Sequence, residues 1–200
     1  LGASLALPVG TELVVPPHSR VTIEGAASTL DGLGARRIFR VEGGGHLELR
    51  NLTLAGGSAY AGGCVWVAED ASFAAVDTVL SNCTAASFGG AVGGLTGSEL
   101  AFKGKSFVAN SSAPRGGGLL SKAGSIELAG DTSISQCEAT YGGAVYVTSA
   151  ATIHVKGQAT ITQCQAASQG GAIFATGRPG STVDLTDRAT ISRCRASRGG

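Results

Sequence analysis

Charged and aromatic side chains are scarce in this sequence of 200 residues: Asp, Glu, Lys and Arg make up 14% of it, and Phe, Trp and Tyr 5%. The apolar runs are only a few residues long, far below the ~20 that a membrane-spanning helix needs, so we expect no span in this segment. The net charge of +1 gives no general field that would attract nucleic acid, and no such partner is expected. Local positive charge gathers only at Arg188, Arg193, Arg195 and Arg198, which we interpret as solvated coil ends.

Glycine, in contrast, is abundant at 32 residues, and its positions are periodic. Gly-Gly pairs begin at residues 62, 89, 116, 142, 170 and 199. From the second pair on, a marker residue precedes each pair by five or six positions, and a large apolar residue stands three positions before the marker. The markers are Cys83, Asn110, Cys137, Cys164 and Cys194, and the apolar residues are Leu80, Phe107, Ile134, Ile161 and Ile191. The sequence therefore repeats about every 27 residues.

This repeat predicts a β-solenoid. Each repeat contains three short apolar or alternating runs divided by Gly, Ser, Asp or Asn, as in AVYV, TIHVKG and ATITQC. No amphipathic helical stretch accompanies them, which excludes the helical solenoids. We therefore expect an all-β parallel β-helix of six to seven coils, with about 27 residues and three strands per coil. Each Gly-Gly pair marks a corner where a positive φ or a close backbone approach excludes a Cβ atom.

The repeat is clear over residues 38–200, which we expect to form the coils. Residues 1–37 carry turn signals such as Pro16, Pro17 and Asp31, and are expected to form an irregular N-terminal turn that caps the solenoid. The sequence opens at Leu1 without a secretory signal and stops within the repeated phrase, so we expect the coils to continue beyond residue 200.

Several phrases in these repeats carry a resemblance to a known family. GGAV at 89 and 142, GGAI at 170 and FVAN at 107–110 resemble the repeats of the chlamydial polymorphic membrane proteins, whose recurring phrases are FxxN and GGA followed by Ile, Leu or Val. The resemblance covers roughly residues 38–200. It implies a right-handed β-helix that is displayed outside the cell and often used for adhesion.

The marker column is interpreted as a structural ladder. Small, soft side chains stacked inward would fill one corner of each coil. Parallel Cβ vectors on neighbouring coils make a poor disulfide, and no His accompanies the column to complete a metal site, so no metal or cofactor is expected. Five cysteines in the sequence do not allow a full disulfide framework, and Cys64 stands in a different column. The expected ladder is Cys83, Asn110, Cys137, Cys164 and Cys194.

Three glycosylation sequons begin at Asn51, Asn82 and Asn110. Asn110 is expected to point inward with the ladder, which would block its modification. Asn51 and Asn82 are the candidate N-glycosylation sites, and they favour a secreted glycoprotein.

One outward column carries the residues of a possible catalytic site. Glu127, His154 and Asp184 each stand ten residues before their Cys marker and should stack on one another. A histidine between two carboxylates has the groups needed for acid–base cleavage of an acidic polysaccharide. A solvated ladder of charges is the competing interpretation. If the chain is an enzyme, a polysaccharide lyase or hydrolase, these are its candidate catalytic residues.

A second outward column offers an interaction face. In the first strand of the repeats, Val65, Val145 and Ile173 alternate with aromatic residues, so one of the two sets should face outward. Aromatic side chains on an outer surface are suited to stacking on sugars or docking another protein. A covering loop, or aromatic side chains that point inward, is the competing interpretation. The candidate interaction face is Trp66, Leu120, Tyr146 and Phe174.

We therefore expect a non-enzymatic scaffold, extracellular or at the cell surface, that serves adhesion or the assembly of a larger structure. Its expected partners are other protein chains, further coils of the same protein, or glycans. The enzyme acting on acidic glycans is the alternative function.

Overall fold

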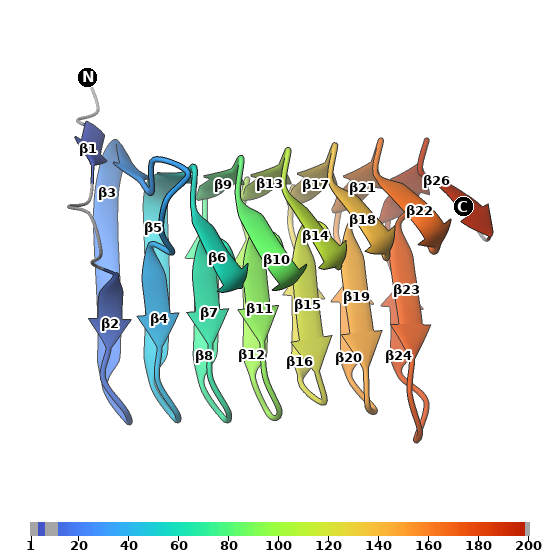
Figure 1. Cartoon of the computed structure of the whole chain (residues 1–200), viewed down its shortest axis with the longest axis horizontal. Helices are drawn as coiled ribbons and strands as arrows, with labels where there is room; N and C mark the ends of the chain where they lie inside the picture. The colour runs from blue at the N-terminus through green and yellow to red at the C-terminus, as the bar shows by residue number, and fades with distance from the viewer. Residues whose placement is uncertain (1–3, 7–11, 199–200) are drawn as a thin grey trace.

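The computed structural model describes residues 4–6 and 12–198. Within these residues the chain forms strands and no helix, and the strands wind into a right-handed parallel β-helix of about 7 turns. Figure 1 shows the coils side by side along the long axis, with the N-terminal coil at the left and the C-terminal coil at the right. The all-β parallel solenoid predicted from the repeat is confirmed.

Two of the three parallel sheets consist of short strands, at most one from each coil. The first sheet consists of β2 (Leu13–Val15), β4 (Phe39–Val41), β7 (Val65–Val67), β11 (Val92–Gly94), β15 (Leu119–Lys122), β19 (Val145–Thr148) and β23 (Ile173–Thr176). The third sheet consists of β6 (Ser58–Ala61), β10 (Thr84–Phe88), β14 (Ser112–Arg115), β18 (Glu138–Tyr141), β22 (Gln165–Gln169) and β26 (Arg195–Arg198).

The second sheet is bent into two arms. It begins with β1 (Ser4–Ala6), β3 (Arg20–Asp31) and β5 (His46–Ala55), and β5 pairs with the first strand of each arm. The first arm contains β8 (Ser72–Val76), β12 (Glu99–Lys103), β16 (Ser125–Leu128), β20 (Thr152–Val155) and β24 (Thr182–Leu185). The second arm contains β9 (Val79–Ser81), β13 (Phe107–Ala109), β17 (Ser133–Ser135), β21 (Thr160–Thr162) and β25 (Thr190–Ser192).

A coil in this region therefore runs through the first sheet, the two arms and the third sheet. The three predicted runs per repeat correspond to the first sheet and the two arms. The strand of the third sheet was not predicted, because segments such as β10 (TAASF) and β14 (SAPR) contain mostly small or polar residues.

The Gly-Gly pairs form the corners between the third and first sheets, as predicted. The first glycine of a pair adopts a positive φ, for example 63° at Gly89 and 64° at Gly116. The second glycine lies against the backbone of the next coil: a Cβ on Gly117 would meet the carbonyl oxygens of Gly143 and Glu138. Both requirements exclude a side chain at these positions.

The internal stack of large apolar residues differs from the prediction at one coil. Phe107 was expected in this stack, but Val108 occupies the position and is 0% exposed, whereas Phe107 lies beside Ser133 on the outer surface. The turn between β12 and β13 is one residue longer than its counterpart before β9, which shifts the register. The observed stack is Leu80, Val108, Ile134, Ile161 and Ile191.

The same shift corrects the marker ladder. Asn110 was expected inward, but it is exposed at the corner with a φ of 48°, and the buried Ser111 takes the ladder position. The hydroxyl of Ser111 donates to the carbonyl of Ala109 at 2.9 Å. The thiol of Cys137 makes the corresponding contact with the carbonyl of Ser135 at 3.4 Å. The ladder is therefore Cys83, Ser111, Cys137, Cys164 and Cys194.

The described part of residues 1–37 is more regular than predicted. Strands β2 and β3 pair in register with β4 and β5, apart from a bulge between Glu24 and Ser28. Arg36 and Arg37 stand where the next coil has Gly62 and Gly63, because Ile38 and Cys64 are matched across the two coils. The glycine signal is thus missing at this corner although the coil is present. Residues 1–3 and 7–11 lie outside the described part of the chain.

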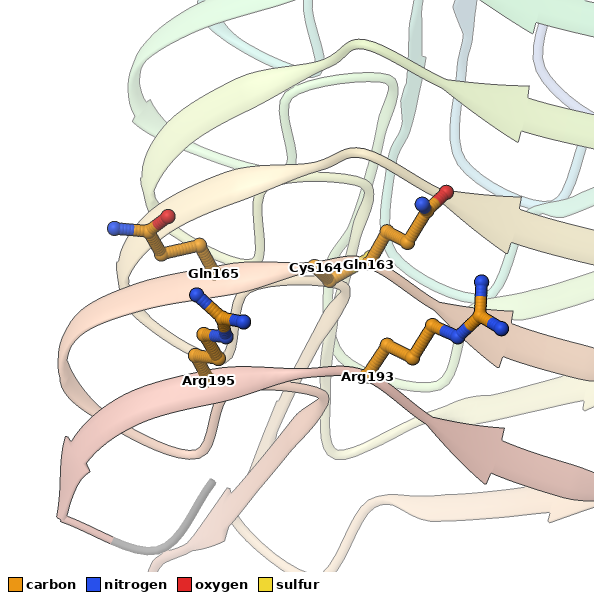
Figure 2. A pocket seen from close by; sticks show the side chains of 5 residues that line it. All are labelled: Gln163, Cys164, Gln165, Arg193 and Arg195. Atoms are coloured by element: carbon orange, nitrogen blue, oxygen red, sulfur yellow. The ribbon is translucent and has the colours of Figure 1, made fainter.

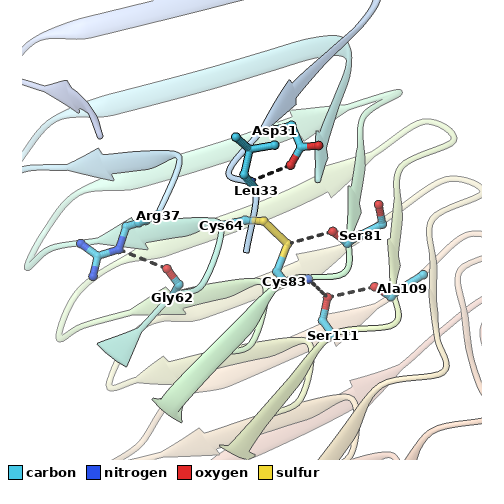
Figure 3. The surroundings of a disulfide bond; sticks show 9 residues. All are labelled: Asp31, Leu33, Arg37, Gly62, Cys64, Ser81, Cys83, Ala109 and Ser111. Carbon is cyan, nitrogen blue, oxygen red and sulfur yellow. Dashed lines mark hydrogen bonds between the residues drawn. A yellow bond between two sulfur atoms is a disulfide. The ribbon is translucent and has the colours of Figure 1, made fainter. Parts of the chain in front are cut away.

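A disulfide that was not predicted joins Cys64 to Cys83, 19 residues apart, with the Cα atoms 5.5 Å from one another (Figure 3). Cys64 directly precedes β7 in the first sheet, and Cys83 belongs to the ladder and comes shortly after β9. The two residues belong to one coil, so the bond closes that coil. Residues Gly118 and Ala144 occupy the Cys64 position two and three coils later.

The register predicts that Ala144→Cys will form a second disulfide, with Cys164. Ala144 and Cys164 occupy the positions that Cys64 and Cys83 hold in their own coil. Closing a loop of similar length should stabilise the fold by roughly 3 kcal/mol in oxidising buffer. Non-reducing peptide mapping and thermal unfolding with and without reductant test this. Pairing of the new thiol with Cys137 or Cys194 would contradict the register, and Ala144→Ser is the control.

Candidate functional site

A column of outward side chains runs along the first sheet. Val65, Leu119 and Val145, which precede its members in the chain, are 0% exposed and fill the interior. The structure therefore places the predicted interaction-face residues in one column outside the solenoid wall, where the three aromatic residues are partly exposed and Leu120 is buried. In coil order, the column is Trp66, Gly93, Leu120, Tyr146 and Phe174.

Aromatic side chains from the third sheet join this column. Phe88, at the end of β10, has its ring centroid 5.6 Å from that of Trp66. Tyr141, at the end of β18, lies 5.6 Å from Phe174, and Tyr146 lies 5.6 Å from the same ring. Phe88 and Tyr141 were not among the predicted residues. The sequence feature that could have identified them is their position directly before a Gly-Gly pair. The corner formed by that pair turns the end of the strand toward the first sheet.

The two aromatic groups flank a groove with a volume of about 300 Å³. Leu120, only 5% exposed, lies between them in the column. Trp66 leans over Gly93, because a Cβ at Gly93 would lie 3.2 Å from the indole ring. We call this hollow the aromatic groove, and its lining is Phe88, Leu95, Arg115, Leu120, Lys122, Tyr146 and Thr148.

Two cations, and no carboxylate, are among the described residues that line the aromatic groove. Arg115 ends β14 and Lys122 ends β15, and both are exposed. Neither forms an ion pair with a carboxylate in the part of the chain that the structure describes. An apolar hollow with cations at its edge is complementary to a flat ring that carries an acidic group.

Arg37 holds the Trp66 side of the groove in place. Its guanidinium lies 5.8 Å from the centre of the indole ring, within the range of a cation–π contact. The same group donates to the carbonyls of Ala61 and Gly62 at 3.0 and 3.1 Å. It also pairs with Glu12 at 3.0 Å. Because these contacts fix the guanidinium, the indole is supported before any ligand binds.

The predicted catalytic column is present on the first arm of the second sheet. Glu127, His154 and Asp184 are paired in register on successive coils. His154 Nδ1 lies 3.1 Å from Asp184 Oδ2, and Glu127 instead pairs with Lys156 Nζ at 2.9 Å. The side chains of His154 and Asp184 are about half exposed, at 50% and 47%. The column holds two separate pairs, not the imidazole shared by two carboxylates that the sequence suggested.

The Glu127–Lys156 pair predicts a small pH dependence of stability. The hydrogen bond from Lys156 lowers the pKa of Glu127 in the folded state. A lowered carboxyl pKa stabilises the fold above the unfolded-state value and loses this effect as the pH falls through the folded-state value. Lys156→Gln should therefore melt slightly below the wild type at pH 7, by a margin that solvent screening keeps small.

That difference in melting temperature should begin to shrink as the pH falls through the unfolded-state pKa of a glutamate, about 4.3, and should vanish once the pH lies below the lowered folded-state value, where Glu127 is protonated in both states. Thermal unfolding across the acid range measures it. The control is Lys105→Gln, which removes a lysine with no ion pair among the described residues. A difference that persists unchanged at the acid end would contradict the assignment.

The free thiols of the ladder contact the backbone of their own coil. Cys164 and Cys194 each donate to a backbone carbonyl at 3.3 Å, those of Thr162 and Ser192. A hydrogen bond with Cys137, together with burial, raises the pKa of Cys164, and burial raises the pKa of Cys194. Protonated thiols are poor nucleophiles. Among the described residues, no group of three or more His, Cys, Asp and Glu side chains is arranged to hold a metal ion.

The sequon asparagines lie at exposed corners of the coils. Asn51 and Asn82 have φ values of 51° and 55° and are both exposed. Asn110 is exposed as well, so the inward orientation expected to block it is wrong. Glycosylation of Asn51 and Asn82 stays a prediction.

Comparisons of the chain with protein-family models, curated proteins and solved structures gave no match. No segment among the described residues is a helix with the length and apolar character needed to cross a membrane. A functional assignment therefore depends on the chemistry of the aromatic groove itself.

Proposed function

We propose that the chain is a non-enzymatic β-helix scaffold outside the cell or at its surface, and that its aromatic groove binds an acidic glycan. The observation that carries the proposal is the combination of two aromatic walls with two cations around one hollow, and neither cation forms an ion pair with a carboxylate among the described residues. The C–H face of a sugar ring packs against an aromatic ring, as other apolar surfaces do. A uronate or sulfate group on that sugar accepts hydrogen bonds from Arg115 and Lys122.

The scaffold supports such binding because the groove is built on strands. Its side chains come from β10, β14, β15 and β19 and from Leu95 after β11, and coil-to-coil hydrogen bonds fix those strands. A preformed site loses little conformational freedom when a ligand binds. Rigid display of a binding groove fits adhesion to a glycan surface.

Three features support a location outside the cell. Disulfides persist mainly in oxidising compartments, and Cys64–Cys83 is one. The sequons at Asn51 and Asn82 are exposed. The phrases that resemble chlamydial surface proteins favour the same location.

Calorimetric titration of the chain with a short oligogalacturonate tests the proposal. Binding should be detectable for this acidic ligand and much weaker for a neutral oligogalactan. Tyr146→Ala should weaken it by about tenfold, since one wall of the groove is lost. Arg115→Gln should also weaken it and reduce the salt dependence.

The control variants lie on other faces. Phe107→Ala removes an outward aromatic residue from the second arm, and His154→Ala alters the possible catalytic column. Both should bind like the wild type. Equal binding by the wild type and Tyr146→Ala would overturn the proposal, as would binding to the neutral and acidic ligands with equal affinity. Selective capture of a protein partner through Tyr146, without glycan binding, would point to protein docking instead.

The His154–Asp184 pair keeps one observation in favour of the enzyme alternative. An imidazole 3.1 Å from a carboxylate has a geometry that a general acid or base can use. Depolymerisation of an acidic glycan that is present in the wild type and lost in His154→Ala would establish that function. Equal background activity in both proteins would remove it.

A further inference from the structure

A second hollow, separate from the aromatic groove, lies at the corner between the second arm and the third sheet. Its volume is about 510 Å³, and we call it the corner groove. Cys164 is 1% exposed and lies at its base. Figure 2 shows the other side chains in two pairs, one on each side of the corner. The lining is Gln163 with Arg193, and Gln165 with Arg195, around Cys164.

The ladder geometry produces these pairs. Gln163 and Arg193 are corner residues with a φ of 55° each, directly before an inward cysteine. Gln165 and Arg195 follow that cysteine, begin β22 and β26, and are paired in register. Because the cysteine points inward, the residues before and after it point outward, one over each strand.

The corner groove is rich in hydrogen-bond donors, and no carboxylate is among the described residues that line it. Neither Arg193 nor Arg195 forms an ion pair with a carboxylate among the described residues. Glu138 is paired in register with Gln165 one coil nearer the N-terminus. A negative ligand should therefore lie over the coils of Gln165 and Arg195 and avoid the coil of Glu138.

We propose that the corner groove binds an acidic polysaccharide in an extended form, with one acidic group on each guanidinium. The two guanidinium groups lie on opposite sides of the corner (Figure 2), an arrangement that suits a polymer with repeated acidic groups. None of the described residues that line this groove is aromatic, so they offer the bases of a single-stranded nucleic acid no surface on which to stack.

Binding of dextran sulfate to the intact chain, with unsulfated dextran as the neutral reference, tests the proposal. The double variant Arg193→Gln/Arg195→Gln should bind dextran sulfate about tenfold more weakly and show a flatter dependence on salt. The matched control is Arg178→Gln/Arg188→Gln, which removes the same charge from the same coil outside the groove. It should change the affinity by about twofold or less. In the background of Tyr146→Ala, which alters the aromatic groove, the Arg193→Gln/Arg195→Gln change should lower the affinity for dextran sulfate by the same factor.

Each competing outcome overturns the proposal in a different way. Equal losses in the two double variants would show that only net charge matters. Inorganic sulfate that binds as tightly as the polymer, at equal sulfate concentration, would show a site for a single ion. Tighter binding of an oligodeoxythymidylate than of dextran sulfate would change the class of ligand. All variants are compared at equal thermal stability, which exposed Arg→Gln changes should preserve.

Discussion

Gly117→Ala is expected to lower the free energy of unfolding by more than about 3 kcal/mol, enough to unfold a marginally stable chain. The added Cβ would meet the carbonyl oxygen of Gly143 and would lie 2.7 Å from the backbone nitrogen of Glu138. Both groups belong to the next coil. That coil cannot move away without losing bonds such as Gly117 N–H to the Gly142 carbonyl at 3.2 Å.

The control for this change is Gly180→Ala. A Cβ at Gly180 meets nothing within 4 Å, so its stability should stay within about 0.5 kcal/mol of the wild type. Urea unfolding followed by the fluorescence of Trp66 measures both variants. Similar midpoints for Gly117→Ala and Gly180→Ala would show that the coils are not packed backbone to backbone at this corner.

Val108→Asp should destabilise the chain by several kcal/mol, whereas Phe107→Asp should cost about 1 kcal/mol. Val108 is 0% exposed between Leu80 and Ile134, where a carboxylate would be buried without a partner. Phe107 faces outward beside Val79 and Ser133, where a carboxylate stays in contact with water.

These neighbouring residues make a useful comparison because they lie on the same strand and face opposite sides of it. Their urea midpoints decide between the observed register and the uniform repeat of the sequence. If Phe107→Asp were the more damaging change, Phe107 would belong to the internal stack and the register shift would be wrong. Phe107→Leu, which keeps an apolar surface outside, should be close to neutral.

The period of the glycine pairs was sufficient to predict the fold, because few residues other than glycine fit a corner with a positive φ and close backbone contact. The same period misplaced Phe107 and Asn110. The turn before β13 has one extra residue, and β14 is one residue shorter than β10. The spacing between the Gly-Gly pairs therefore stays the same and does not show the register shift between them. At the first corner, Arg36 and Arg37 stand in place of the glycines, so the repeat signal is missing although β2 and β3 pair in parallel with the next coil.

The disulfide and part of the site depend on contacts that spacing alone does not show. Cys64 and Cys83 stand in different columns, and the fold brings their Cα atoms within 5.5 Å of one another. The alternation in the first sheet predicted two columns, one of them with Trp66 and Tyr146, but did not decide which of the two faces outward. Phe88 was missed because it comes from another sheet, and the angle of the corner brings it against that column.

The arginines near the C-terminal end illustrate the same limit. They were interpreted as solvated coil ends, which is the usual role of a charge cluster on a surface. The structure divides these arginines into two groups. Arg193 and Arg195 line the corner groove, and Arg188 is not among its described lining residues. That sorting requires knowing which residues flank an inward cysteine at a corner.

The central claim is that a ligand binds in the aromatic groove, and an NMR titration of the ¹⁵N-labelled chain with oligogalacturonate tests it most directly. The account predicts that the amide shifts of Leu95, Leu120 and Tyr146 change together and saturate at one ligand concentration. Changes centred on His154 and Asp184, or no saturable change at any amide, would contradict it.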